Sequence, residues 1–221
     1  MFKGVLIDWG GVLTTGLAEA IGGWIAADRI DASHYGDVMR GLVRHAYDGE
    51  RATDDPAVNN IVHALERGEL ATGDFERALA ARLVTVDGVP PVAEGLIARM
   101  FLGFERIESM YAMLAAARAN GLRTCLLSNS WGNDYPREGW DEAFDDIVIS
   151  GEVGMRKPEP RIFEHALGRL GVSAEECVFV DDVEANVEAA KVLGITGIHH
   201  QDPGDTIVRL EGLLGVPLRT P

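Results

Sequence analysis

The spacing of apolar residues changes character along the chain. An almost continuous apolar run over residues 2–7 ends at Asp8 and is followed by Gly10-Gly11, which is typical of a strand buried on both faces of a parallel sheet. From about residue 17 to residue 102 the apolar positions recur at helical spacing instead. This stretch has no convincing strand pattern, so we expect it to be entirely helical.

From Gly103 onward, strand-like and helix-like segments alternate. Short apolar runs at 122–127, 147–149, 177–180 and 195–198 predict four strands, and the segments between and after them are amphipathic at helical spacing. Such alternation indicates a parallel sheet with helices on both faces. The first strand needs a pairing partner, so we expect it to join this sheet, which makes the helical stretch an insertion.

The pattern therefore predicts an α/β fold with a Rossmann-like, doubly wound parallel sheet and an inserted all-helical cap domain. The core domain would comprise residues 1–15 and 103–221, and the cap residues 16–102. A length of 221 residues suits this organisation. Two helix starts are expected from local signals: Thr72 as an N-cap, and Pro158 in the first turn of the next core helix.

The charge balance excludes several classes of partner. The chain has 20 basic and 35 acidic residues, a net charge of −15, so it lacks the basic excess needed to bind nucleic acid or an anionic membrane. No stretch approaches the ~18 apolar residues of a spanning helix, and the N-terminal apolar run is too short for a signal peptide. We expect a cytoplasmic protein.

Polar residues follow three of the expected strands, at the edge where open α/β sheets bind ligands. They are Asp8, Ser128-Asn129 and Asp181-Asp182. Lys157 stands just before the helix expected from Pro158, where free backbone N–H groups favour an anion. Three neighbouring carboxylates would repel one another unless a cation joined them, and Mg²⁺ prefers such oxygen ligands.

Four segments together resemble the motifs of the haloacid dehalogenase superfamily, in the same order and at similar spacing. They are Val5–Leu13, Leu126–Asn129, Gly154–Pro160, and Val178–Asp182 with Asn186 following. One such motif would be weak, whereas four in order are specific and span nearly the whole chain. The helical insertion between the first two resembles the cap of the superfamily's helical-cap class.

The resemblance implies a phosphomonoester hydrolase that acts through an aspartyl-phosphate intermediate. Asp8 would be the nucleophile, which splits the hydrolysis into two easier steps. Ser128 and the backbone of Asn129 would hold phosphoryl oxygens. Lys157 would neutralise the nucleophile and the transferring group. The implied substrate is a small phosphorylated metabolite, such as a sugar phosphate, and the implied assembly is a monomer or homodimer.

The resemblance also implies a Mg²⁺ cofactor. A carboxylate oxygen of Asp8, the backbone carbonyl of Gly10 and the side chain of Asp182 would hold the ion. Asp181 and Asn186 would orient the water molecules around it. Which of the two consecutive aspartates contacts the metal is open, and we assign the direct contact to Asp182.

Position 10 departs from the pattern of the resembled phosphatases, which usually carry a second Asp two residues after the nucleophile as general acid and base. Because Gly10 stands there, the usual donor for general acid catalysis is missing, and such catalysis typically accelerates the reaction ~10²–10⁴-fold. Three outcomes stay open: a leaving group that needs little protonation, a replacement acid from the cap, or no phosphatase activity. The alternatives are accordingly a 2-haloacid dehalogenase, or a non-catalytic or regulatory protein with this fold. The carboxylate pair Asp181-Asp182 favours the metal-dependent phosphatase.

Three features lie outside the motifs. The aromatic-rich loop Trp131–Trp140 is either a packed surface loop or a wall of the substrate pocket. His199-His200 is expected at a surface strand end. In the resembled fold, Cys125 and Cys177 lie on strands either side of the first, ~9–10 Å apart, too far for a disulfide.

Overall fold

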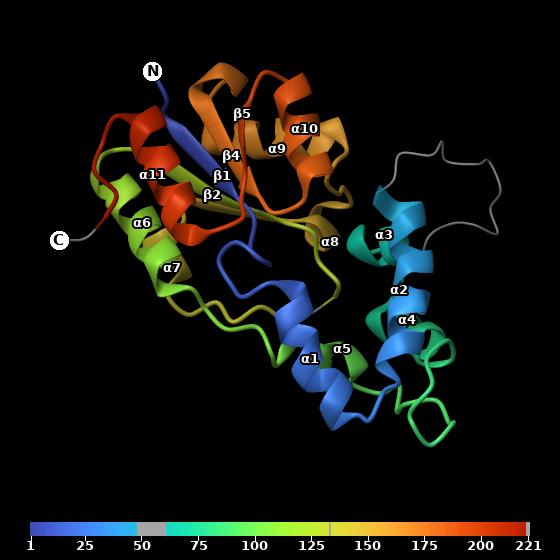
Figure 1. Cartoon of the computed structure of the whole chain (residues 1–221). Helices are drawn as coiled ribbons and strands as arrows, with labels where there is room; N and C mark the ends of the chain where they lie inside the picture. Colours follow the sequence, from blue (N-terminus) through green and yellow to red (C-terminus); the bar gives the residue numbers. More distant parts are fainter. Residues whose placement is uncertain (48–60, 133, 220–221) are drawn as a thin grey trace.

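Five parallel strands form the centre of the protein, in the order β3-β2-β1-β4-β5. The computed structural model describes residues 1–47, 61–132 and 134–219, so residues 48–60 of the expected cap lie outside the described residues. The strands are β1 (Gly4–Ile7), β2 (Arg123–Ser128), β3 (Asp146–Ile149), β4 (Cys177–Asp181) and β5 (Thr196–His199). The predicted Rossmann-like parallel sheet is confirmed (Figure 1).

The strand register brings the polar strand ends together. Ile7, the last residue of β1, lies opposite Leu126 on one side and Val180 on the other. The chain beyond these three residues therefore leaves the sheet at one edge. Asp8 continues the pairing there, because its N–H donates to the carbonyl of Val180 at 2.9 Å.

Helices cover both faces of the sheet, as the alternation of side chains along each strand requires. Val5 and Ile7 of β1 face one buried cluster, and Leu6 faces another. Helices of the first face are α6 (Glu108–Ala119), α7 (Trp140–Ala143) and α11 (Pro203–Leu214); those of the second are α9 (Pro160–Leu170) and α10 (Glu184–Val192). Figure 1 shows the same two layers.

The residues between β1 and α6 form a block of helices with a hydrophobic cluster of its own. This helical block consists of α1 (Leu17–Ala27), α2 (Ala32–Tyr47), α3 (Ile61–Glu66), α4 (Thr72–Ala80) and α5 (Leu96–Phe101). It lies beside the end of the sheet where β1 terminates (Figure 1). The two segments that connect it to the core run side by side, because Thr14 pairs with Arg106 and the N–H of Ile107 donates to Leu13.

Two predicted helix starts are wrong. The N-cap of α4 is Ala71, and the Thr72 hydroxyl instead donates to the carbonyl of Gly132 at 3.3 Å. Helix α9 begins at Pro160, which occupies the first turn, so Pro158 and Lys157 lie in the loop before the helix. The short helices α7 and α8 (Ser150–Val153) were not expected, because four residues give no readable periodicity.

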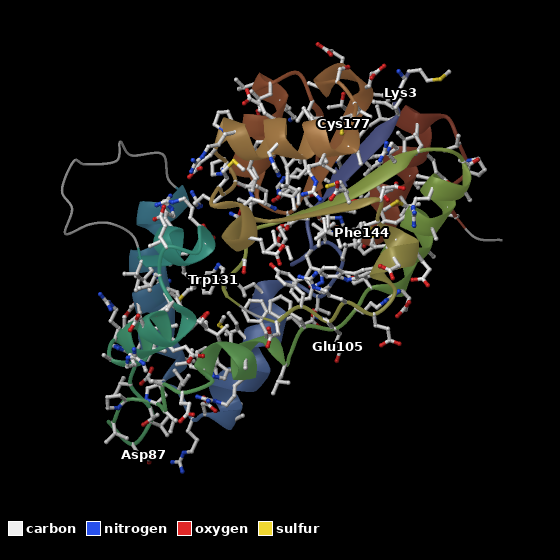
Figure 2. All side chains as sticks on the ribbon, turned by 180° about the vertical axis from the view of Figure 1, so that it is seen from behind. Lys3, Asp87, Glu105, Trp131, Phe144 and Cys177 are labelled. Carbon is white, nitrogen blue, oxygen red and sulfur yellow. The ribbon has the colours of Figure 1, made fainter. Side chains whose placement is uncertain are left out.

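Both cysteines are buried and free, as predicted. Cys125 lies on β2 and Cys177 on β4, so β1 runs between them. Figure 2 shows Cys177 near Lys3, at the end of the sheet away from the helical block. Across the described residues, no helix is both long and apolar enough to cross a membrane.

Candidate active site

A buried ammonium joins two carboxylates at the carboxyl edge of the sheet. The Lys157 Nζ lies 2.8 Å from Asp8 Oδ1 and 2.6 Å from Asp181 Oδ2, and its side chain is 1% exposed. The N–H of Trp9 also donates to Asp8 Oδ1, at 2.8 Å. The Trp9 N–H and the distant Lys157 thus orient the Asp8 carboxylate, and Asp181 in turn holds the lysine.

Asp181 and Asp182 have different surroundings although they are consecutive. The carboxylate of Asp181 is fully buried and accepts hydrogen bonds from the Val183 N–H at 2.8 Å and the Asn186 amide at 3.1 and 3.2 Å, besides the ammonium. Asp182 is partly exposed. Asp181 is therefore saturated by protein donors, whereas Asp182 keeps an accessible face.

The carboxylates of the site carry more negative charge than the protein compensates. Burial raises the pKa of Asp8 to about 8, with Lys157 opposing this shift and the two neighbouring aspartates adding to it. Burial and the charge of Asp181 raise the pKa of Asp182 to about 6. Burial opposes the charged form of Lys157, but its two carboxylate partners raise the pKa of its ammonium further.

This donor set fits a hard divalent cation. Asp8, Asp181 and Asp182 each offer a carboxylate oxygen within 4.8 Å of the others, and one ammonium faces the three acids. Gly11 permits this arrangement: its φ is +71°, and a Cβ there would lie 2.2 Å from Asp182 Oδ2. A cation would offset the charge that the single ammonium leaves uncompensated.

The end of β2 contributes two side chains with separate tasks. The buried hydroxyl of Ser128 lies 3.0 Å from the hydroxyl of Tyr135, whose pKa burial raises to about 12. The side-chain amide of Asn129 donates to the carbonyl of Lys157 at 3.0 Å and accepts from its N–H at 2.8 Å. The sequence suggested a backbone role for Asn129; the structure adds that its side chain holds the lysine segment in place.

The expectation of a surface strand end is wrong for His200, whereas His199, the last residue of β5, is partly exposed. His200 is 5% exposed and its Nδ1 lies 2.8 Å from the Thr206 hydroxyl, since α11 packs over the end of β5. Burial lowers the pKa of His200. His199 Nε2 lies 3.0 Å from the carbonyl of Asp182, so this strand end supports the site.

Comparisons with known proteins agree with this geometry. A family model described as haloacid dehalogenase-like hydrolase matches residues 2–194. The chain belongs to this hydrolase family. It is 32% identical to the sesquiterpene phosphatase astK of Aspergillus oryzae over 68% of this chain and 77% of that protein, and 35% identical to a phosphoserine phosphatase of Thermus thermophilus over 58% and 57%.

Other relatives are much longer than this member of the family. The chain is 28% identical to acyl-CoA dehydrogenase family member 10 of Mus musculus over 98% of its own length, but spans 20% of that protein. It likewise spans 21% of bifunctional epoxide hydrolase 2 of Rattus norvegicus, at 31% identity over 48% of this chain. The haloacid dehalogenase-like unit thus occurs in these relatives as one part of a larger protein.

Solved structures of other haloacid dehalogenase-like proteins share the fold. One, from Bacteroides thetaiotaomicron, was solved with magnesium and inorganic phosphate; it has a TM-score of 0.64 and 20% identity, covering 91% of this chain and 95% of that one. A phosphatase of Thermococcus onnurineus has a TM-score of 0.61 and 21% identity, covering 98% and 100%. At these identities the likeness concerns the fold.

Gly10, which stands where phosphatases of this superfamily usually carry an acid, leaves open space beside Asp8. Its φ lies outside the left-handed region. Among the described residues other than its two chain neighbours, a Cβ there would meet one atom within 4 Å, Phe104 Cε1 at 3.9 Å. Neither backbone strain nor crowding therefore requires glycine at this position. Where those phosphatases carry a carboxyl group, an aromatic ring borders the space.

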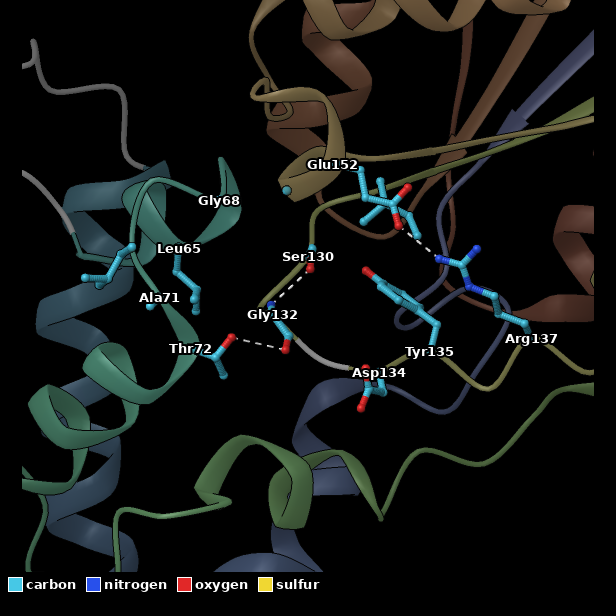
Figure 3. Close-up of a pocket in the computed structure, with 13 residues that line it drawn as sticks. Leu65, Gly68, Ala71, Thr72, Ser130, Gly132, Asp134, Tyr135, Arg137 and Glu152 are labelled. Carbon is cyan, nitrogen blue, oxygen red and sulfur yellow. Dashed lines mark hydrogen bonds and ion pairs between the residues drawn. The ribbon is translucent and has the colours of Figure 1, made fainter.

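A pocket of about 440 Å³ opens between the helical block and the loop after β2. The loop supplies Ser130, Asp134, Tyr135 and Arg137, and the turn before α4 supplies apolar residues opposite (Figure 3). Tyr135 thus belongs to the pocket and contacts Ser128 of the site. The middle of the loop Trp131–Trp140 thus lines a pocket, and its role as a wall of the substrate pocket stays a prediction.

The two tryptophans at the ends of that loop are packing elements. Trp140 is 2% exposed within the core cluster, and Trp131 lies edge-on to Phe75 of the helical block, with ring centroids 5.8 Å apart. Figure 2 shows Trp131 beside the helical block. The loop therefore joins the core to the block while part of it lines the pocket.

A buried ion pair fixes the helical block to the segment that carries Lys157. Glu66, the last residue of α3, is fully buried and pairs with Arg156 Nε. The carbonyl of Glu66 accepts from the Ser150 hydroxyl at 2.5 Å, and that hydroxyl accepts from the Ser130 N–H at 2.7 Å. No sequence pattern indicates this pair, because its residues are ninety positions apart.

Proposed function

We propose that this protein is a Mg²⁺-dependent phosphomonoester hydrolase that acts on a small phosphorylated metabolite, such as a sugar phosphate. The observation that carries the proposal is the junction of Asp8, Lys157 and the partly exposed Asp182 on one sheet edge. The phosphatases among the relatives, and the family member solved with magnesium and phosphate, support it.

In this proposal Asp8 attacks the phosphorus atom. A bond forms between the Asp8 carboxylate oxygen and phosphorus while the ester P–O bond breaks, and water then hydrolyses the aspartyl-phosphate. The Lys157 ammonium, 2.8 Å from Asp8, opposes the rise in the pKa of that carboxyl group and attracts the phosphoryl oxygens. Ser128 and the Asn129 backbone bind those oxygens from the end of β2.

The residues for Mg²⁺ are Asp8, the Gly10 carbonyl and Asp182. When bound, the ion supplies positive charge that neutralises the phosphoryl group and the carboxylates around it. Asp181 would not bind it directly, because its carboxylate already accepts hydrogen bonds from Lys157, the Val183 N–H and the Asn186 amide. Asp181 would position the lysine, and Asp181 and Asn186 together would orient the water molecules around the ion.

We further propose the division into a core of residues 1–15 and 103–221 and a cap of residues 16–102. The separate hydrophobic cluster of the helical block and its paired connections support this division. A cap at the carboxyl edge of the sheet would enclose a small substrate. A cytoplasmic location and a monomeric or homodimeric state stay predictions.

Three observations would separate this function from the alternatives. We expect phosphate release from a panel of metabolites to require both Mg²⁺ and the Asp8 carboxylate, so that Asp8→Asn is inactive but folded. Release of halide from 2-haloacids without Mg²⁺ would identify a dehalogenase instead. Mg²⁺ binding without turnover of any compound would indicate a non-catalytic protein.

A further inference from the structure

The space beside the nucleophile is bordered by hydrocarbon where a proton donor is expected. The direction in which a side chain at Gly10 would project leads to the Phe104 ring, and apart from Trp9 and Gly11 no other described residue has an atom within 4 Å of that Cβ position. Phe104 belongs to the segment between α5 and α6. A leaving group that extended in this direction would meet the edge of an aromatic ring.

Phe104 is one of four rings in mutual contact, here called the aromatic wall: Trp9, Phe101, Phe104 and Tyr135. Trp9 stacks on Phe104 with centroids 5.4 Å apart and on Phe101 at 6.2 Å, and Phe101 stacks on Phe104 at 4.8 Å. Tyr135 lies edge-on to Trp9 at 5.0 Å. Trp9 directly follows the nucleophile, and Tyr135 contacts Ser128, so the wall is continuous with the site.

The rings of the aromatic wall are fixed by packing, but part of their surface is accessible to solvent. A Cβ at Gly103 would lie 2.3 Å from the carbonyl oxygen of Ala20, so glycine lets this segment press against α1. Trp9 is 4% exposed, whereas Phe101 and Phe104 are only partly buried. The wall therefore has fixed rings with accessible surface and, at Phe101 and Phe104, no hydrogen-bonding group for a sugar hydroxyl.

We propose that the leaving group of the substrate is an aromatic alcohol, so that the protein hydrolyses aryl phosphates. This inference rests on the proposed phosphatase function and narrows its substrate class. A phenol has a pKa near ~10, whereas an aliphatic alcohol has one roughly like that of water, ~15.7. A phenolate leaves without a proton donor, and its ring can stack on the wall.

The proposed step needs no additional acid. The bond between phosphorus and the aryl oxygen breaks, its electron pair stays on that oxygen, and the bond to Asp8 forms. The phenolate takes a proton from solvent after departure. The water that opens the aspartyl-phosphate gives its hydroxyl to phosphorus and one proton to solvent, so ester and water become phenol and inorganic phosphate.

Phenyl phosphate and cyclohexyl phosphate test the proposal, because they have similar size and apolarity but differ in ring planarity and in leaving-group pKa. With Mg²⁺, we expect kcat/KM for phenyl phosphate to exceed that for cyclohexyl phosphate by about 100-fold or more, the usual effect of a missing acid. Glucose 6-phosphate serves as the sugar ester. Equal or faster turnover of either aliphatic ester would overturn the inference but keep the phosphatase; no turnover of any ester would overturn both.

The contribution of the ring itself is tested with Phe104→Leu. This variant should lower the ratio of phenyl to cyclohexyl turnover about three- to tenfold, because an aromatic contact is lost while apolar volume is kept. The matched control is Phe2→Leu, which changes another half-buried ring of the same hydrophobic cluster, at the opposite end of β1. An unchanged ratio in folded Phe104→Leu would overturn the stacking role.

The binding of phosphonates tests the same recognition without turnover and without any substitution in the protein. Phenylphosphonate and cyclohexylphosphonate cannot be hydrolysed, and calorimetry with Mg²⁺ measures their affinity for the wild-type chain. We expect phenylphosphonate to bind about three- to tenfold more tightly. Equal affinities, or tighter binding of the cyclohexyl compound, would contradict recognition of an aromatic ring.

Discussion

Restoring an acid at position 10 is the most direct test of how this site handles the leaving group. In Gly10→Asp the new side chain would project toward Phe104, 3.9 Å from its Cβ, in a backbone conformation that any residue adopts. The carbonyl of residue 10 would be retained, so the proposed metal ligands stay in place. The substitution adds a carboxyl group without requiring the turn to move.

The expected gain follows from the surroundings of the new carboxyl. Burial and neighbouring carboxylates raise the pKa of Asp182 to about 6 and that of Asp8 to about 8, and the same causes would act at position 10. A protonated share would therefore persist near neutral pH and decline as the pH rises through the raised pKa. General acid catalysis contributes ~10²–10⁴-fold, and we expect the lower end, about 2.7 kcal/mol, for an untuned acid.

The variant also carries a cost in stability. A carboxyl beside the aromatic wall loses part of its hydration, which costs about 1–3 kcal/mol when hydrogen bonds do not replace it. In a chain of this length each kcal/mol corresponds to a change in Tm of roughly 2–4 °C. The gain in transition-state stabilisation for a poor leaving group and the loss in folding stability are thus separately measurable.

The assay compares cyclohexyl and phenyl phosphate in wild type, Gly10→Asp and Gly10→Asn. Only the aspartate can donate a proton to the leaving oxygen, so the ratio of cyclohexyl to phenyl turnover should rise about 100-fold in that variant and not in the asparagine control. Thermal melting establishes that each variant is folded. A ratio that does not rise in folded Gly10→Asp would refute the argument, since it would mean that another group already donates the proton.

Three further predictions concern the metal site and the helical block. Asp182→Asn should weaken Mg²⁺ binding more than Asp181→Asn, since only the former carboxylate is partly exposed; calorimetric titration decides, and equal losses would contradict the assignment. Gly11→Ala should lower Mg²⁺ affinity about tenfold or more, because the added Cβ would lie 2.2 Å from Asp182 Oδ2 and would displace that carboxylate. An unchanged Mg²⁺ affinity in calorimetric titration would contradict this prediction. Glu66→Gln should reduce the free energy of unfolding in urea by about 3–5 kcal/mol, because it removes the buried counter-charge of Arg156; a loss below 1 kcal/mol would argue against it.

The hydrophobic pattern predicted the sheet and the helical character of the insertion because these features depend on local periodicity. All five strands lie where apolar runs end in polar residues, and the register then brings Asp8 and Asp181 to one edge. Lys157 was placed at the site from its motif, although the helix after it begins two residues later than expected. Local periodicity thus determines where the strands and helices lie in the sequence. The order of the strands in the sheet determines which of their end residues come together.

Contacts between distant segments could not be predicted in the same way. The hydroxyl of Tyr135 lies near Ser128, and Glu66 pairs with Arg156, because tertiary packing brings these residues together. Neither pair has a periodicity or a fixed spacing that a sequence pattern expresses. The burial of His200 could not be predicted for the same reason. The sequence pattern places it at the end of a strand, and only the packing of α11 covers that end.

The adjacent glycines show how far residue identity alone can mislead. Gly11 has a positive φ and lies against the carboxylate of Asp182, so only a residue without Cβ lets that aspartate approach the nucleophile. Gly10 has neither constraint, and a side chain would fit there. Gly11 is therefore explained by geometry and Gly10 by chemistry, because the chain can carry an acid at position 10 and does not. A site that leaves this space to the edge of Phe104 is suited to a group that departs as a stable anion, and a proton donor would give such a group little further advantage.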